Sequence, residues 1–393
     1  MAEQIAYFDH NATTPLDRGV LEAMSPYFVE VFGNPASRNH HAGQRAAEAV
    51  ELARANVARL INAQAKEIVW TSGATESNNL AIFGVVAFAK AESSGHVITQ
   101  LTEHLAVRDS CRELEQRGVD ITWLEVDSEG RVDPQSVHDA IRPETSLVSI
   151  MVANNETGTI QQIREIGHAC KEAGVLFHTD AAQAIGKIPI DVEAECIDLM
   201  SLSSHKIYGP KGVGALYVRS KNPRVKLRPM LFGGGHERGY RSGSINVPGV
   251  VGFGEACRIA AGQMSKDSEG LTKLRDRLER GIQDAIEGVH VNGCPASRLA
   301  HVSNLRFEKI EAESLLMMLE GVAASTGSAC SSLSIEPSHV LIAMGLSESE
   351  AFGSVRFSLG RSNTDAQVDL VIQRVVSVVK KLRQLNPAYS PQL

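Results

Sequence analysis

The sequence predicts an α/β protein, with a mainly parallel sheet in a larger domain and a smaller α+β domain after it. Apolar runs alternate with helical patterns from about residue 45 to residue 220, which implies a parallel sheet covered on both faces. After Pro248 the pattern changes to long helices and then short strands. The chain has 393 residues, more than one hydrophobic core usually serves, so two domains are expected.

The elements of the first part follow one another in a regular order. A helical pattern over Ala46–Leu60 precedes a short strand over Glu67–Thr71, which leads into the turn Ser72-Gly73-Ala74-Thr75. Five further strands are expected in this part, in chain order Val97–Thr99, Leu147–Val152, Val175–His178, Leu199–Leu202 and Val213–Val218.

The second part contains fewer and longer elements. Val251–Gln263 and Leu271–Ile286 each have a helical pattern, and we expect two long helices there. Short strands around Val302–Phe307, a helix over Glu313–Leu319 and a last helix over Val368–Leu385 complete it. We place a large domain at residues 15–256 and a small domain at residues 1–14 and 257–393.

Composition excludes several classes of protein. There are 39 Lys and Arg against 46 Asp and Glu, a net charge of −7, which argues against nucleic-acid binding because that needs a basic face. No apolar run approaches the roughly 18 residues of a membrane span, and the first residues lack the pattern of a secretory signal. We therefore expect a soluble cytoplasmic protein that binds neither nucleic acid nor membrane.

Neither the cysteines nor the histidines indicate a metal site. The six cysteines are widely spaced, with no Cys-x-x-Cys pair, so neither a disulfide framework nor a zinc site is suggested. His40 and His41 are adjacent, so their side chains point different ways in regular structure. We expect no metal.

Polar side chains follow several predicted strands at their carboxyl ends. His104, Asn155, Asp180 and Lys206 all have this placement. Open α/β sheets bind ligands along that edge, and four unrelated surface loops would not share the position so regularly. The sequence therefore predicts a binding site there without reference to any family.

The segment Ser203-Ser204-His205-Lys206-Ile207-Tyr208-Gly209 is the most informative one. A lysine in this position can form a Schiff base with a carbonyl compound, because desolvation and cationic neighbours free its amine. Most lysines instead extend from the surface into solvent. Asp180, in Thr179-Asp180-Ala181-Ala182-Gln183, favours the first interpretation, because a carboxylate paired with a Schiff-base lysine is typical of bound pyridoxal phosphate.

A phosphate site is expected at the start of the helix that follows Thr71. The segment from Ser72 to Asn79 opens this helix, and backbone N–H groups at a helix N-terminus bind anions. Thr75, Ser203 and His205 can add side-chain donors. The alternative is an ordinary structural cap, since Ser and Thr are common in caps.

Nine segments in order give the chain a resemblance to a known family. They are Asp9-His10-Asn11-Ala12-Thr13-Thr14-Pro15, Phe32-Gly33-Asn34-Pro35, Thr71 to Asn79, Glu103-His104, Asn154-Asn155-Glu156, His178-Thr179-Asp180, the Lys206 segment, Gly233 to Gly243, and Ser325 to Cys330. The chain resembles the cysteine desulfurases of the NifS/IscS type, which are fold-type I, class V aminotransferase-like enzymes that use pyridoxal phosphate. The matches run nearly end to end.

The resemblance implies a role for each candidate residue. Lys206 would carry the cofactor and move the substrate Cα proton, Asp180 would keep the pyridine nitrogen protonated, and His104 would stack on the ring and take part in catalysis. Asn155 and Arg356 would bind the substrate carboxylate, which suits the planar fork of Arg; spacing alone leaves Arg356 open as a solvent-facing strand residue. The implied cofactor-binding set is Ala74, Thr75, His104, Asn155, Asp180, Gln183, Ser203, His205, Lys206 and Ser244, with Gln183 on the phenolic oxygen.

Cys330 lies among small residues in Ser325-Thr326-Gly327-Ser328-Ala329-Cys330-Ser331-Ser332, a composition that favours a mobile loop. Without the cofactor an idle loop cysteine is an equal alternative. With it, a thiolate that takes the sulfur of bound cysteine is what the chemistry needs. The expected product is a persulfide on Cys330 together with L-alanine.

The expected protein is a homodimeric L-cysteine desulfurase that passes sulfur to an acceptor or scaffold protein for iron–sulfur clusters or thio-cofactors. Ser244 stands where the family usually has Thr, whose hydroxyl reaches the phosphate in the neighbouring subunit. Selenocysteine lyase or aminotransferase activity on the same fold is the first alternative, and a binding module without chemistry is the second. A nucleotide-dependent oxidoreductase is a poor third, because the first βα unit lacks a GxGxxG turn.

Overall fold

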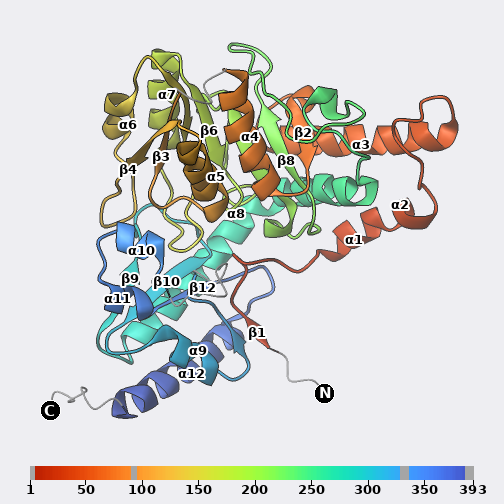
Figure 1. The fold of residues 1–393 in the computed structure, drawn as a ribbon. Coiled ribbons are helices and arrows are strands. Elements are labelled where there is room, and N and C mark those ends of the chain that lie inside the picture. The colour runs from red at the N-terminus through yellow and green to blue at the C-terminus, as the bar shows by residue number, and fades with distance from the viewer. Residues whose placement is uncertain (1–4, 90–94, 328–335, 386–393) are drawn as a thin grey trace.

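The structure is a computed structural model that describes residues 5–89, 95–327 and 336–385 (Figure 1). Its strands are β1 (Ala6–Tyr7), β2 (Ile68–Thr71), β3 (His96–Gln100), β4 (Asp120–Leu124), β5 (Thr145–Ser149), β6 (Leu176–Asp180), β7 (Leu199–Ser203), β8 (Gly214–Val218), β9 (Val289–Asn292), β10 (Val302–Phe307), β11 (Val322–Ala323) and β12 (Ser354–Ser358). Its helices are α1 (Arg18–Met24), α2 (Pro26–Val29), α3 (His41–Leu60), α4 (Ala74–Phe88), α5 (Leu105–Gln116), α6 (Pro134–Ala140), α7 (Ile163–Ala173), α8 (Val247–Gln283), α9 (Ala312–Met318), α10 (His339–Ala343), α11 (Glu348–Phe352) and α12 (Asp365–Leu385).

The larger sheet has seven strands in the order β2-β8-β7-β6-β5-β3-β4. Its pairs are parallel except those of β8, which runs antiparallel to both β2 and β7. The predicted α/β class and mainly parallel sheet are therefore confirmed.

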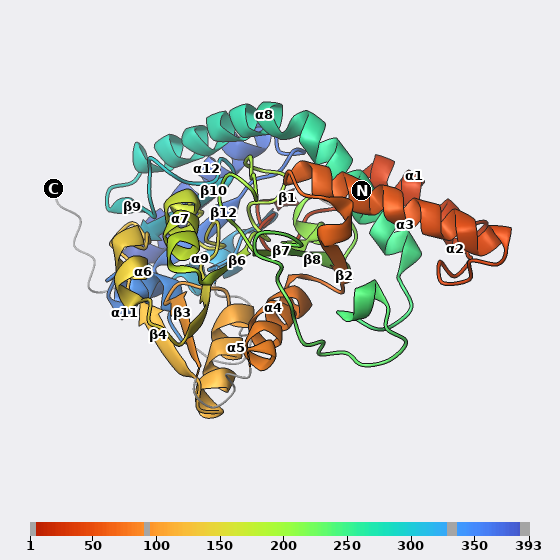
Figure 2. The same cartoon turned by 90° about the horizontal axis from the view of Figure 1, so that it is seen from above.

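Helices cover both faces of this sheet, and Figure 2 shows α3 and α8 on one side and α4 and α5 on the other. Successive strand residues point to opposite faces, so neighbours in one strand enter different cores. Val97 packs in the core under α4 and α5, whereas Ile98 packs in the core that α3, α7 and α8 share. Burial on both faces explains why these strands are continuous apolar runs.

A smaller antiparallel sheet in the order β12-β10-β9 lies beyond the larger one. Its apolar core contains residues of β10, β12, α9, α12 and the end of α8. The N-terminal segment belongs here too, since Ala6 and Phe8 are in this core and β1 pairs with β11. The predicted domain boundaries, at residues 14–15 and 256–257, stay a prediction.

The prediction of two helices after Pro248 is wrong. Residues Val247–Gln283 form one continuous helix, α8, which Figure 1 shows running from the larger sheet to the smaller one. The connecting stretch Met264–Gly270 is polar and contains no proline, so it continues the helix along the surface instead of breaking it. The polar stretch marks only a change from buried to exposed helix.

None of the helices in the described part of the chain has the length and apolarity that crossing a membrane needs. Within the same residues, no three His, Cys, Asp or Glu side chains are grouped so that they could hold a metal ion.

Candidate active site

The four polar residues predicted at strand ends converge on one cavity. His104 follows β3, Asn155 follows β5, Asp180 ends β6 and Lys206 follows β7. All four line a cavity of about 480 Å³. Because β3, β5, β6 and β7 are parallel, their carboxyl ends meet at one edge of the sheet, as the sequence predicts.

Asp180 presents a fixed carboxylate in this cavity. Its Oδ2 accepts a hydrogen bond of 2.7 Å from Nδ2 of Asn78, and its Oδ1 accepts one of 2.8 Å from the Ala182 N–H. Asn78 is fully buried on α4, whereas Asp180 is 6 % exposed. The carboxylate is therefore held from two sides and is placed to bind a cationic ring nitrogen.

Lys206 lies in a 3-10 turn that begins directly after β7. Its Nζ donates to the backbone carbonyls of Asn11, at 2.5 Å, and Ala12, at 2.9 Å. The N-terminal segment thus passes the carboxyl ends of the parallel strands and contacts the lysine predicted to hold the cofactor. Asn11 is itself tied to β12, because its N–H donates to Oγ of Ser358 at 2.9 Å.

The start of α4, where the sequence predicts a phosphate site, lies at the cavity. Ala74 and Thr75, the first residues of this helix, line the cavity, and Gly73 before them offers no capping side chain. Their backbone N–H groups have no acceptor among the described residues, as expected for the first turn of a helix. Ser203 and His205 line the same cavity. A helix N-terminus with these donors is suited to a phosphate group.

His205 is held neutral. Its Nδ1 lies 3.1 Å from Oγ1 of Thr13. Burial lowers the pKa of His205 to about 4, and the charges of Lys206, Lys211 and Lys187 add to this effect. At neutral pH the ring can therefore donate one hydrogen bond and carries no charge.

His104 has a defined tautomer. It caps α5, and its Nδ1 accepts a hydrogen bond of 3.1 Å from the Ala106 N–H. In the neutral ring the proton then resides on Nε2. The side chain lines the cavity with this protonated nitrogen as its remaining ring donor.

Arg356 does not line the cavity itself but contacts Asn155, which does. Its Nη1 donates to the backbone oxygen of Asn155 at 2.9 Å, and its Nη2 donates to Oδ1 of Asp9 at 2.6 Å. Arg356 is 4 % exposed, and its Nε has no partner among the described atoms. The solvent-facing alternative for Arg356 is therefore wrong.

Gln183 is also near this cluster, and its amide is oriented. Its Nε2 donates to the backbone oxygen of Asn11 at 3.0 Å, and its side chain lines the cavity.

Two predicted site residues are not brought together with the others. Ser244 is exposed and lines a separate hollow of about 260 Å³, together with Tyr27, Phe32 and Asn34. Cys330 lies outside the described residues.

Sequence reasoning missed two residues of the site. Asn11 joins Lys206, Gln183 and Asn155, whose backbone oxygen accepts from its Nδ2 at 3.0 Å. Asn78 holds Asp180. The available signal for Asn78 was a polar residue flanked by the apolar run Leu80–Val86 on one helix; for Asn11 there was none, because its partners are remote in the chain.

Pyridoxal phosphate fits these residues. The start of α4 offers N–H donors for a phosphate, Asp180 offers a carboxylate for a ring nitrogen, and Lys206 lines the same cavity. Fold and site together define an α/β enzyme dependent on that cofactor.

Comparison with known sequences places the chain within one family. A sequence model described as "Aminotransferase class-V" matches residues 6–371. The chain belongs to the class-V aminotransferase family. This family uses pyridoxal phosphate, so the predicted cofactor is confirmed.

Curated relatives support a narrower assignment. A protein named cysteine desulfurase IscS from Anaeromyxobacter sp. (strain Fw109-5) is 54 % identical over 383 residues, which cover 98 % of this chain and 94 % of the relative. The mitochondrial cysteine desulfurase of Arabidopsis thaliana is 51 % identical over 383 residues, covering 98 % of this chain and 84 % of the relative. The predicted resemblance to cysteine desulfurases is confirmed.

Two solved structures agree with the fold. A NifS-like protein superposes with a TM-score of 0.89 at 36 % identity, covering 96 % of this chain and 100 % of the other. The protein described as SspA in complex with cysteine superposes with a TM-score of 0.80 at 41 % identity, covering 90 % of this chain and 98 % of the other.

Proposed function

We propose that this chain converts L-cysteine to L-alanine and leaves the substrate sulfur as a persulfide on Cys330. The activity as a cysteine desulfurase follows from relatives that are about half identical over 98 % of the chain. The observation that carries the proposal in the structure is the convergence of Lys206, Asp180 and His104 on one cavity.

Different residues around the cavity hold different parts of the cofactor. Ala74, Thr75, Ser203 and His205 bind its phosphate, and Asp180 holds its ring nitrogen in the protonated state. Pyridoxal phosphate, when bound, supplies an electron sink that stabilises negative charge at the substrate Cα. Lys206 anchors the cofactor through its amine.

Two side chains handle protons. Nζ of Lys206 takes and returns the proton of the substrate Cα, because it is the amine next to the bound cofactor. Nε2 of His104 carries the other exchangeable proton, since Nδ1 is occupied by the Ala106 N–H. Both groups line the cavity and act on the same ligand.

Arg356 and Asn155 bind the substrate carboxylate. Asp9 and the Asn155 carbonyl hold the guanidinium on two of its nitrogens. A buried guanidinium N–H that lacks a partner costs free energy, so Nε of Arg356 favours an incoming acceptor.

Cys330 is assigned as the sulfur acceptor because the other five cysteines are buried in the fold. Burial raises the pKa of Cys111, Cys170, Cys257 and Cys294, which keeps these thiols protonated. In the overall reaction the Cβ–S bond of cysteine breaks and an S–S bond to Cys330 forms. The thiol hydrogen is kept in the products, so L-cysteine and one thiol give L-alanine and one persulfide.

The enzyme acts as a homodimer in this proposal, and Ser244 reaches the phosphate of the neighbouring subunit. The support is that Ser244 lies away from its own cavity, in a hollow bordered by the exposed Phe32. Large apolar side chains are exposed on α2 and in the segment before Ser244, which is typical of a covered surface. They are Phe28, Val29, Phe32, Met230, Leu231 and Phe232.

The persulfide sulfur passes to an acceptor or scaffold protein that builds iron–sulfur clusters or thio-cofactors. The similarity to relatives named cysteine desulfurase IscS supports this role. The location in the cytoplasm stays a prediction from the sequence.

The deciding experiment measures alanine formed from L-cysteine, with a reductant present, by the purified protein and by its Cys330→Ser variant. Alanine from the wild type alone is the expected result. Equal alanine from both proteins would indicate a lyase reaction that bypasses Cys330. No alanine from either, with the cofactor bound, would favour aminotransferase activity.

A further inference from the structure

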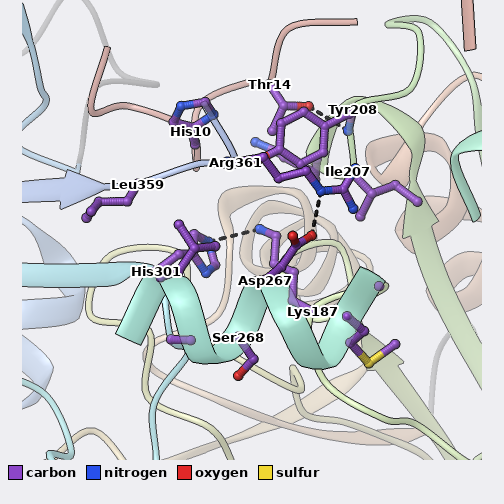
Figure 3. Close-up of a pocket in the computed structure, with 15 residues that line it drawn as sticks. His10, Thr14, Lys187, Ile207, Tyr208, Asp267, Ser268, His301, Leu359 and Arg361 are labelled. Atoms are coloured by element: carbon purple, nitrogen blue, oxygen red, sulfur yellow. Dashed lines mark hydrogen bonds and ion pairs between the residues drawn. The ribbon is translucent and has the colours of Figure 1, made fainter. Parts of the chain in front are cut away.

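Figure 3 shows the residues of a second, smaller cavity, which Lys206 also lines. Its volume is about 30 Å³, and it is lined by Lys187, His301, His10 and Asp267 among others. Lys206 lines both this cavity and the larger one, so it stands in the wall between them. The smaller cavity is too small for a substrate. Its polar side chains can therefore influence the reaction only through the residues that separate the two cavities.

Lys187 and His301 are joined in this cavity, as the dashed line in Figure 3 marks. Nζ of Lys187 lies 3.0 Å from Nε2 of His301 and donates to Oε1 of Gln183 at 3.2 Å. His301 and Gln183 both contact Asn11, which accepts from Lys206. Lys187 therefore closes a ring of polar contacts around Asn11.

The contacts of Asn11 define which atoms carry the protons in this ring of polar contacts. Nδ2 of Asn11 donates to the carbonyl of Asn155, so Oδ1 is the atom that faces His301, at 2.8 Å from its Nε2. Nε2 of His301 must then carry a proton and donate to Oδ1. That N–H leaves no lone pair for an ammonium group, so the 3.0 Å contact fits a neutral Lys187 amine.

The surroundings agree with a neutral amine. Lys187 is partly accessible because it lines the cavity, but burial of its amine lowers its pKa well below the usual value, and Lys206 and Arg356 lower it further. The acidic group of the cavity, Asp267, is paired with Arg361. Titratable and charged groups from every element packed against Lys187 face it and its partner His301. They are Lys206, His10, His301, Arg356, Arg275, Asp267 and Arg361.

The orientation of the Gln183 amide follows from these contacts. Oε1 accepts from Lys187, and one Nε2 hydrogen is donated to the Asn11 carbonyl. The second Nε2 hydrogen is left for a ligand in the larger cavity, which Gln183 lines. Without Lys187 the amide can rotate and present its oxygen to that ligand.

We propose that Lys187 is a positioning residue: its uncharged amine fixes the Gln183 amide so that an N–H faces the phenolic oxygen of the cofactor. This inference rests on the proposed function. An N–H donor stabilises the ionised form of that oxygen. It therefore sets the pH at which the bound cofactor changes its absorbance.

The test is a double-mutant cycle read by absorbance. Wild type, Lys187→Met, Gln183→Met and the double variant are loaded with pyridoxal phosphate, and the pH midpoint of the visible absorbance is measured for each. Both single variants are expected to raise the midpoint by about one pH unit, the worth of a hydrogen bond to an ionised group. The double variant should show no further rise, because both changes remove the same donor.

Two further variants separate positioning from a general loss of structure. Lys187→Arg keeps a donor for Gln183 but adds a charge beside Lys206, so its midpoint should fall. Lys171→Met, at an exposed lysine of α7, should leave the midpoint unchanged. A merely structural role would move the Met and Arg variants of Lys187 in the same direction.

An unchanged midpoint in Lys187→Met would overturn the proposal, and so would additive shifts in the double variant. If Lys187→Met does not fold, a rise in Lys187→Arg instead of a fall contradicts it equally. A wild type that binds no chromophore would refute the proposed function itself, which distinguishes the two failures.

Discussion

Nδ2 of Asn78 donates a 2.7 Å hydrogen bond to Oδ2 of Asp180, which links α4 to the end of β6. The same helix begins at the predicted phosphate site with Ala74 and Thr75. In the proposed site, one helix would thus position both the phosphate and the ring nitrogen of the cofactor. The spacing of Thr75 and Asn78 along this helix would set the distance between the sites for the phosphate and the ring nitrogen.

Replacing Asn78 by alanine is expected to lower kcat/KM for alanine formation by about tenfold or more. Asp180 would lose one of its two hydrogen-bond donors, and a hydrogen bond to a charged group is worth about 1.5–3 kcal/mol. Asn79→Ala is the control, because the side-chain bond of Asn79 seen among the described residues is to the Thr75 carbonyl of its own helix. Equal kinetics in the two variants would contradict the role of Asn78.

Arg356 is expected to act through its planar fork and not through charge alone. Arg356→Lys keeps the charge but cannot contact Asp9, Asn155 and a substrate carboxylate together. We expect KM for L-cysteine to rise by at least about tenfold, with a smaller change in kcat. Arg306→Lys, on the neighbouring strand β10, is the control and should leave KM near the wild-type value.

Lys206→Ala is expected to lose its cofactor on dialysis, because the covalent anchor is gone. The wild type and the exposed-lysine control Lys221→Ala should keep the cofactor absorbance under the same conditions. The check is absorbance together with phosphate analysis after dialysis. Full retention and full activity in Lys206→Ala would contradict the assigned role.

Glu103 gives the fold a pH dependence. Burial raises the pKa of this carboxyl to about 8, although Gln100 and the Met151 N–H donate to its Oε1. A carboxyl with a raised folded-state pKa contributes its full stability below its unfolded value. That contribution is lost as the pH rises through about 8.

Glu103→Gln should therefore show a smaller fall in the free energy of unfolding between pH 5 and pH 8 than the wild type. Urea unfolding of the cofactor-free proteins at the two pH values measures it. Glu115→Gln, at an exposed position on α5, is the matched control. A variant with the wild-type difference would mean that Glu103 is ionised in the fold.

Local pattern was enough to predict six of the seven strands of the larger sheet and the residues at its edge, but not β4 (Asp120–Leu124). Each apolar run of strand length ends in a polar residue at His104, Asp180 or Lys206, so the parallel topology alone brings them together. The assignment of Cys330 to the site rests on the motif from Ser325 to Cys330 and on the need of the reaction for a thiol that accepts sulfur.

Contacts between remote segments could not be predicted in this way. Asn11 bonds to Ser358, Lys206 and His301, which lie far along the chain, so its role follows only from the packing of the N-terminal segment on both sheets. The unbroken helix α8 was missed because a polar stretch on an exposed helix has the composition of a loop. Lys187 gave no signal, since its contacts arise only in the folded chain.

The most direct measurement of the central claim follows the sulfur atom itself. The protein is incubated with L-cysteine carrying a heavy sulfur isotope, and its peptides are analysed by mass spectrometry without reductant. The account predicts one labelled sulfur atom on the peptide that contains Cys330, removed by later reduction, with L-alanine formed in equal amount. Alanine without label on that peptide, or label spread over the peptides of Cys111, Cys170 and Cys257, would contradict it.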